Sequence, residues 1–276
     1  MDLPDPIVVL KGTLPPIGAG LLLVSLGGAR LTAAAAAIGC YLAFGLLKSW
    51  PALPHELWSA PDGREWLVWS VVFVACASTL ERLRWLPAKL GPGLAVVLAA
   101  ACVWLMTRKL AQRWDTANVL LHVGGGGVLV ALLALACRKA LARAPATIAP
   151  AVVFSTVLSI DAVLLTIAAS GLLGQLCGAV AAALGAAAGT ALWRRSFALT
   201  AADGTWLGIA HGLFVLLGAH LAELLWPAAL AALAAPSALL LLGNGTQQRP
   251  VRWTLLALLL TSLPLGFAIW WQLTRR

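Results

Sequence analysis

The sequence predicts an all-α polytopic membrane protein with about ten transmembrane helices, arranged as two inverted five-helix repeats. Three observations support this fold class. Of the 276 residues, 61% are apolar and only 11% are charged, whereas soluble domains are about half apolar and about a quarter charged. Apolar runs of about 18 residues or more, long enough to cross a bilayer, recur from end to end. Short segments also recur about 140 residues later in the chain.

Charged residues, prolines and glycines divide the apolar sequence into ten expected helices. These are 7–28, 31–50, 66–84, 90–108, 117–137, 149–168, 171–192, 205–225, 227–243 and 252–272. Tryptophans mark most of the expected ends, as an interfacial aromatic belt requires: Trp50, Trp66, Trp85, Trp104, Trp114, Trp193, Trp206, Trp226, Trp253 and Trp270. The first helix follows an acidic N-terminus, so we expect it to be retained rather than cleaved as a signal peptide.

The repeat is visible as a nearly constant offset between matching segments. A shift of 140 residues aligns Trp66-Leu67 with Trp206-Leu207, and Pro87-Ala88 with Pro227-Ala228, without a gap. The expected halves are residues 1–140 and 141–276. Because five helices is an odd number, the second half must enter the membrane from the opposite side, as in many secondary transporters. A duplication with a purely structural outcome is the alternative.

In this layout the chain resembles the drug/metabolite transporter superfamily (EamA-like), whose members consist of two five-helix repeats of about this total length. The residues that carry the resemblance are Arg30-Leu31, Gly63-Arg64-Glu65-Trp66 and Arg194-Arg195 at helix starts, the polar breaks Thr107-Arg108-Lys109 and Gly243-Asn244-Gly245, and the glycines of each last helix, Gly124 to Gly127 and Gly266. The chain lacks the acidic residue common after the fourth and ninth helices. The resemblance therefore implies the fold and carries over no substrate.

Ionisable groups inside a bilayer are costly and are functional candidates by default. Asp161 lies deep in the sixth expected helix, where it would suit proton or substrate coupling. The alternative is a protonated or paired carboxyl group with a structural role between helices. Ser155 and Ser159 form a hydroxyl stripe on the opposite side of the same helix. Lys11 lies at the position equivalent to Ser155 in the first repeat, so either it pairs with Asp161 or it extends to the interface.

Three histidines also lie inside expected helices. His220 and Glu223 are three residues apart and share a helical face, so they either relay protons or lie near the interface. His211 is a further coupling candidate, although nine residues from His220 it points the opposite way. No cofactor is indicated; a bis-histidine haem would need His122 together with His211 or His220.

Helix breaks at matching positions of both halves point to a transporter site. Gly124, Gly125, Gly126 and Gly127 follow His122, and Pro264 is the repeat equivalent of Gly125. Both positions are therefore expected to interrupt a helix near the site, unless the glycines serve packing alone. No metal site is expected, because the five cysteines lack metal-ligand spacing.

These observations favour a secondary-active transporter for a small organic solute, with proton coupling through Asp161, in the bacterial cytoplasmic (inner) membrane. The alternative is a non-catalytic subunit of a larger membrane complex.

The net charge of +9 is spread over the connections and does not indicate nucleic-acid binding. The nucleotide-binding P-loop and the motifs GxSxG, HExxH and CxxC are absent, which leaves an intramembrane lipid-modifying enzyme as the remaining enzymatic option. The expected partners are the lipid bilayer and the solute, with a homodimer or complex partners as further options.

Overall fold

The computed structural model describes residues 6–59, 62–193, 197–242 and 249–275, and all regular structure in them is helical. The α-helices are α1 (Pro6–Gly27), α2 (Thr32–Leu47), α3 (Pro54–Ser59), α4 (Gly63–Arg82), α5 (Gly91–Ala111), α6 (Thr116–Val119), α7 (Gly126–Arg143), α8 (Ala149–Ile167), α9 (Gly171–Gly189), α10 (Ala201–Leu221), α11 (Trp226–Ala234) and α12 (Pro250–Thr274). A π-helical turn (Leu120–Gly125) joins α6 to α7, and a 3₁₀ segment (Pro236–Leu242) follows α11. The all-α prediction is confirmed.

Seven helical segments in this part of the chain are long and apolar enough to cross a membrane. They mark the chain as an integral membrane protein. The segments are Ile7–Leu47, Ala88–Ala111, Thr116–Arg143, Ala149–Ile167, Gly171–Gly189, Ala201–Leu221 and Pro250–Thr274.

Three of the ten expected helices do not stand as separate segments among these seven, each for a local reason. The first segment, Ile7–Leu47, contains both α1 and α2, because only a short 3₁₀ turn separates them. Helix α4 carries charged residues in its first and last turns. The apolar helix Trp226–Leu242 is shorter than 18 residues, which is below the usual length of a spanning helix.

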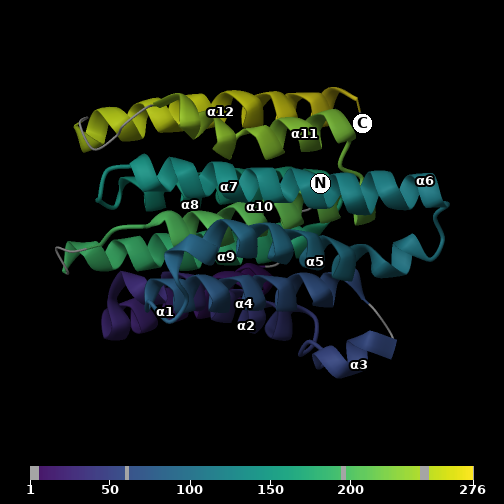
Figure 1. Ribbon diagram of the computed structural model, residues 1–276, viewed down its shortest axis with the longest axis horizontal. Helices are drawn as coiled ribbons and strands as arrows, with labels where there is room; N and C mark the ends of the chain where they lie inside the picture. Colours follow the sequence, from purple (N-terminus) through teal and green to yellow (C-terminus); the bar gives the residue numbers. More distant parts are fainter. Residues whose placement is uncertain (1–5, 60–61, 194–196, 243–248, 276) are drawn as a thin grey trace.

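The long helices lie side by side along the long axis of the molecule (Figure 1). Helices α1, α2 and α4 form one side, α11 and α12 form the other, and α10 lies between them. Every residue of α10 from Ala202 to Gly218 is buried. A helix that is apolar and buried all round must be surrounded by other helices. Helix α10 is therefore the core element against which the site is built.

Glycines let α10 approach α7 closely. A Cβ atom added at Gly204 would lie 2.5 Å from the carbonyl oxygen of Cys137, and one at Gly208 would lie 2.7 Å from Cα of Ala134. Both neighbours are backbone atoms, which cannot move aside. This spacing of small residues four apart is typical of close helix contacts in membranes.

Helices α4 and α10 pack against each other and run in opposite directions. At one end, a Cβ atom added at Gly63 would lie 3.5 Å from Cδ1 of Leu221. At the other end, the Ser78 hydroxyl donates a hydrogen bond of 2.9 Å to the carbonyl of Ala202. The start of α4 therefore lies beside the end of α10, and the end of α4 beside the start of α10.

Two ion pairs close the end of the bundle where α4 ends. Arg82 Nη1 lies 2.6 Å from Asp203 Oδ2. Arg138 of α7 binds the Glu81 carboxylate through both of its terminal nitrogens, at 2.9 Å and 2.5 Å. All four side chains are at most 12% exposed. Together the pairs, here called the ion-pair clamp, tie α4, α7 and α10 at one end.

Candidate functional site

Asp161 of α8 and His211 of α10 meet inside the bundle. Asp161 Oδ2 lies 2.5 Å from His211 Nδ1, and His211 Nε2 lies 3.0 Å from the carbonyl oxygen of Ala232 in α11. The side chains are 0% and 1% exposed. The pair therefore links three helices through polar contacts that are shielded from solvent.

The contacts of His211 determine where its protons lie. A backbone carbonyl only accepts hydrogen bonds, so Nε2 of His211 must carry a proton and donate it to Ala232. One further proton is shared between Nδ1 and Asp161 Oδ2, whether it lies on the nitrogen or on the oxygen. The pair has no net charge in either arrangement, and it becomes charged when it gains or loses one proton.

The second carboxylate oxygen of Asp161 has no such partner. Oδ1 is buried and accepts no hydrogen bond in the described part of the chain. A buried polar atom without a partner destabilises a fold by about 1–3 kcal/mol. The contact of Oδ2 with His211 stabilises the fold, but it gives no reason for an unpartnered Oδ1, which is available to bind a proton or a solute group.

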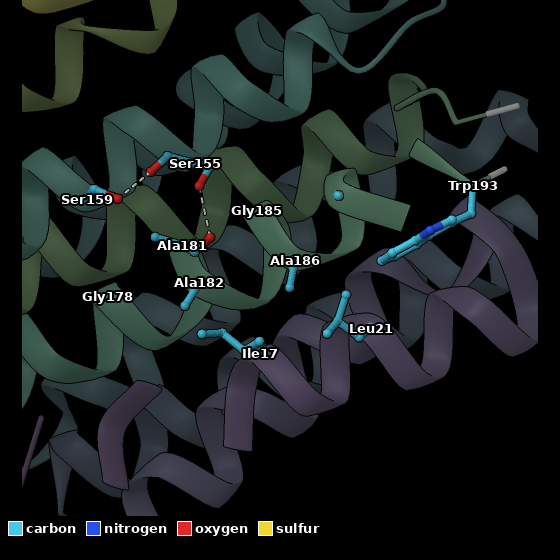
Figure 2. A pocket seen from close by; sticks show the side chains of 11 residues that line it. Ile17, Leu21, Ser155, Ser159, Gly178, Ala181, Ala182, Gly185, Ala186 and Trp193 are labelled. Carbon is cyan, nitrogen blue, oxygen red and sulfur yellow. Dashed lines mark hydrogen bonds between the residues drawn. The ribbon is translucent and has the colours of Figure 1, made fainter. Parts of the chain in front are cut away.

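The hydroxyl stripe predicted on α8 faces away from Asp161. Ser155 and Ser159 line a groove of about 390 Å³ between α1, α8 and α9, and Figure 2 shows both side chains on its α8 wall. Ser155 donates to the carbonyl of Ala181 at 2.9 Å, and Ser159 donates to the carbonyl of Ser155 at 2.8 Å. Asp161 is absent from the lining of this groove, so the groove does not bring the two polar faces of α8 together.

Lys11 is exposed on α1, whereas Asp161 is fully buried and already paired with His211. The ion pair between Lys11 and Asp161 that the sequence suggested does not form. Lys11 lies near the start of α1. At such a position the ammonium group of a lysine reaches water easily.

His220 and Glu223 do not share the helical face that the sequence predicts for them. Helix α10 ends at Leu221, and Glu223 lies in the following turn, where its backbone N–H donates to the carbonyl of Ala168 at 2.9 Å. His220 instead contacts aromatic rings. A three-residue spacing places two residues on one face only while the helix continues, which is why the prediction fails here.

His122 and His220 form a cluster with two tryptophans, here called the ring cluster. The two imidazole centroids are 5.1 Å apart, and Trp114 and Trp226 each contact both histidines at 4.9–5.6 Å. The sequence places these tryptophans at the interface and gives no sign that they meet, because the connection before α6, the π-helical turn, α10 and α11 each supply one of the four residues.

The ring cluster does not fit a bis-histidine haem. Axial imidazoles lie on opposite faces of the macrocycle, whereas the rings of His122 and His220 are in direct edge-to-face contact. His211 cannot substitute for His220, because both of its nitrogens are already engaged by Asp161 and Ala232.

Of the two expected helix breaks, only the glycine segment departs from a regular α-helix. The chain stays helical through Gly124, Gly125, Gly126 and Gly127, with a π-helical turn over Leu120–Gly125. Helix α12 is continuous through Pro264, so the matching interruption is absent there. A proline removes one hydrogen bond from a helix and need not end it in a membrane, where neighbouring groups compensate.

Two segments of the superfamily resemblance, Arg194-Arg195 and Gly243-Asn244-Gly245, lie outside the described residues. Comparison of the chain with protein-family models, curated proteins and solved structures gives no match.

Proposed function

We propose that the chain is a proton-coupled secondary transporter for a small organic solute, with Asp161 and His211 as its proton-binding pair. The observation that carries the proposal is the buried contact between Asp161 and His211 in the interior of an apolar helix bundle. Ionisable groups at this depth are rare and typically belong to proton or substrate pathways. A pair that holds one shared proton can bind another proton or release the one that it holds. Proton binding and release are the events that a coupled carrier needs.

The proposal includes ten crossings in two inverted five-helix repeats. The seven spanning segments become ten crossings when α1 and α2 are counted separately and when α4 and α11, with its 3₁₀ extension, are added. The repeat offset of 140 residues places Gly63–Arg82 on residues 203–222, so α4 and α10 are equivalent helices. Their antiparallel packing is what an inverted repeat requires.

The packing of α1 supports the same inversion. A Cβ atom added at Gly12 would lie 3.9 Å from Cβ of Gln175, and one added at Gly20 would lie 2.5 Å from the carbonyl oxygen of Ala183. Residue numbers rise together along both helices, so α1 runs parallel to α9. Ser155 of α8 bonds Ala181 of α9, and Cys177 of α9 bonds Leu158 of α8, so α8 runs antiparallel to α9. Helices α1 and α8 are equivalent in the repeat and therefore run in opposite directions.

In this proposal the structure corresponds to a closed conformation. The ion-pair clamp holds α4, α7 and α10 together at one end, and Asp161 is out of reach of water. Alternating access would require the clamp to open so that protons can reach Asp161. The groove beside Ser155 and Ser159 is the candidate solute path, in a carrier of the EamA-like type in the bacterial cytoplasmic membrane.

A subunit role in a larger membrane complex is the second candidate, and one observation favours it. The core is filled, with α10 buried from Ala202 to Gly218, as expected for a protein that moves no solute. A subunit would remain bound to other chains through detergent purification, whereas a carrier would purify alone or as a small oligomer.

Reconstitution into liposomes that contain a pH-sensitive dye tests the transporter proposal. Amino acids, organic acids and sugars are supplied outside under a proton gradient, and solute-dependent acidification of the lumen is recorded. We expect one solute class to drive proton entry, and Asp161→Asn to abolish it. Asp115→Asn, at the exposed start of α6, is the matched control and should retain activity. Absence of proton movement with every solute, in a protein that purifies with other chains, would favour the subunit role.

A further inference from the structure

A second cavity shares no lining residue with the groove at Ser155 and Ser159. It has a volume of about 600 Å³ and is formed by α7, α10, α11 and the π-helical turn at Leu120–Gly125. This volume is within the range of sites that hold small organic ligands, about 300–1,000 Å³. The cavity is separate from Asp161, so a ligand here is independent of the proposed proton pair.

One end of the cavity is polar and aromatic. His122 and Trp226 both line it, and their rings are stacked, with centroids 5.6 Å apart and planes inclined by 27°. His220 contacts both rings, and its Nε2 is buried without a hydrogen-bond partner in the described residues. The ring cluster therefore offers imidazole groups that can donate a hydrogen bond, next to a flat aromatic wall.

The rest of the cavity is apolar and opens towards the bilayer. Leu121, Val128 and Leu230 line it and are 64%, 58% and 50% exposed. Leu121 and Val128 belong to the candidate membrane-spanning segment Thr116–Arg143, so their exposed alkyl side chains face lipid. A ligand with an apolar tail can thus enter from the membrane and keep its tail among acyl chains.

Open space lies beside the π-helical turn, next to the polar end of the cavity. Wide turns of this kind are frequent at functional sites. Gly125 belongs to this turn and lines the cavity, and a Cβ atom added there would meet no atom within 4 Å. A planar group can therefore lie directly against the backbone at this point.

We propose that this cavity binds a lipid-soluble molecule with a planar ring that bears carbonyl oxygens, of the quinone class. The ring lies between Gly125 and Trp226, a ring carbonyl accepts a hydrogen bond from the His122 imidazole, and the apolar tail extends past Leu121 and Leu230. None of the nine lining residues is a lysine or arginine. This disfavours the phosphate of a phospholipid, which arginine and lysine typically recognise.

Photolabelling of the purified full chain in phosphatidylcholine nanodiscs tests the site. The probe is an azidoquinone, competed by decylubiquinone, and labelled peptides are identified by mass spectrometry. We expect saturable labelling within residues 121–130 and 226–230 that decylubiquinone suppresses. His122→Phe keeps the ring stacking but removes the N–H group, and should weaken competition about fivefold, the usual effect of losing one neutral hydrogen bond.

A pair of glycine variants separates specific binding from partitioning into lipid. Gly125→Leu places a side chain in open space beside His122 and should abolish saturable labelling. Gly266→Leu introduces the same side chain on α12, where an added Cβ also meets no atom within 4 Å, and should leave labelling unchanged. The proposal is overturned if the wild type is labelled uniformly and without saturation, if brominated phospholipid competes as well as decylubiquinone does, or if Gly125→Leu retains full labelling.

Discussion

Arg82 and Asp203 are 121 positions apart in the sequence, yet the guanidinium and the carboxylate lie 2.6 Å from each other at the junction of α4 and α10. Asp203 Oδ2 also accepts from the backbone N–H and the hydroxyl of Thr200, at 2.7 Å and 2.9 Å. The carboxylate therefore both caps α10 and holds α4 in place. This dual role makes the pair a sensitive point for stability.

Removing one partner of this pair should be strongly destabilising. Arg82→Ala leaves the carboxylate of Asp203 buried without its counter-charge, which typically lowers the free energy of unfolding by about 3–5 kcal/mol. Thermal unfolding of the detergent-purified protein measures the effect. The double variant Arg82→Ala with Asp203→Asn should recover part of the loss, because no buried charge remains. Equal loss in the single and double variants would contradict this explanation.

The close contact between α7 and α10 leads to a second prediction. Gly208→Ala places a methyl group 2.7 Å from Cα of Ala134, so the helices must separate, and overpacking of this kind destabilises by about 1–3 kcal/mol. Gly266→Ala is the control, because its added Cβ meets nothing within 4 Å and alanine favours helix. The midpoint of thermal unfolding should fall for the first variant only.

The all-α, membrane-embedded class could be predicted from the sequence because the bilayer requires long apolar helices. The number of separate spans was harder to predict. Helix α4 keeps charged residues such as Glu81 and Arg82 at its end, where they pair with α7 and α10. Apolar periodicity does not reveal such pairing, because the partners are distant in sequence.

The sequence identifies Asp161 and His211 as separate candidates, but it does not indicate that they are in contact. Asp161 was identified from its depth in a helix, and its distance from the serine stripe followed from helical angles. Its partner His211 lies 50 positions away, and no local pattern could identify it. The same holds for the ring cluster, since Trp114 and Trp226 each resemble an ordinary interfacial residue when considered alone.

Asp62 should make stability depend on pH in the acidic range. Burial raises the pKa of this carboxyl, but the hydrogen bond from the Arg64 N–H and the positive charge of Lys48 outweigh it, so its pKa lies below the ordinary value of 3.8. The stabilisation is therefore complete above pH 3.8 and is lost as the pH falls towards the lowered pKa. Because the side chain is 39% exposed, the contribution should be below about 1 kcal/mol.

Thermal unfolding of Asp62→Asn between pH 3 and pH 7 measures this contribution. Asparagine still caps α4, so the variant should lose a little stability at neutral pH and show a weaker decline in acid than the wild type. Asp115→Asn caps α6 in the same way and serves as control. An unchanged acid profile in Asp62→Asn would show that other carboxyl groups determine the decline.

Variants of Asp161 should separate a structural role from proton coupling. Asp161→Asn can donate an amide hydrogen to Nδ1 of His211 while Nε2 keeps its bond to Ala232, so unfolding free energy should stay within about 1 kcal/mol of the wild type. Asp161→Ala leaves Nδ1 buried without a partner and should lower it by about 1–3 kcal/mol. If the pair binds the coupled proton, both variants lose proton entry although only the second loses stability. If the pair is structural, activity should follow stability, and Asp161→Asn would transport normally.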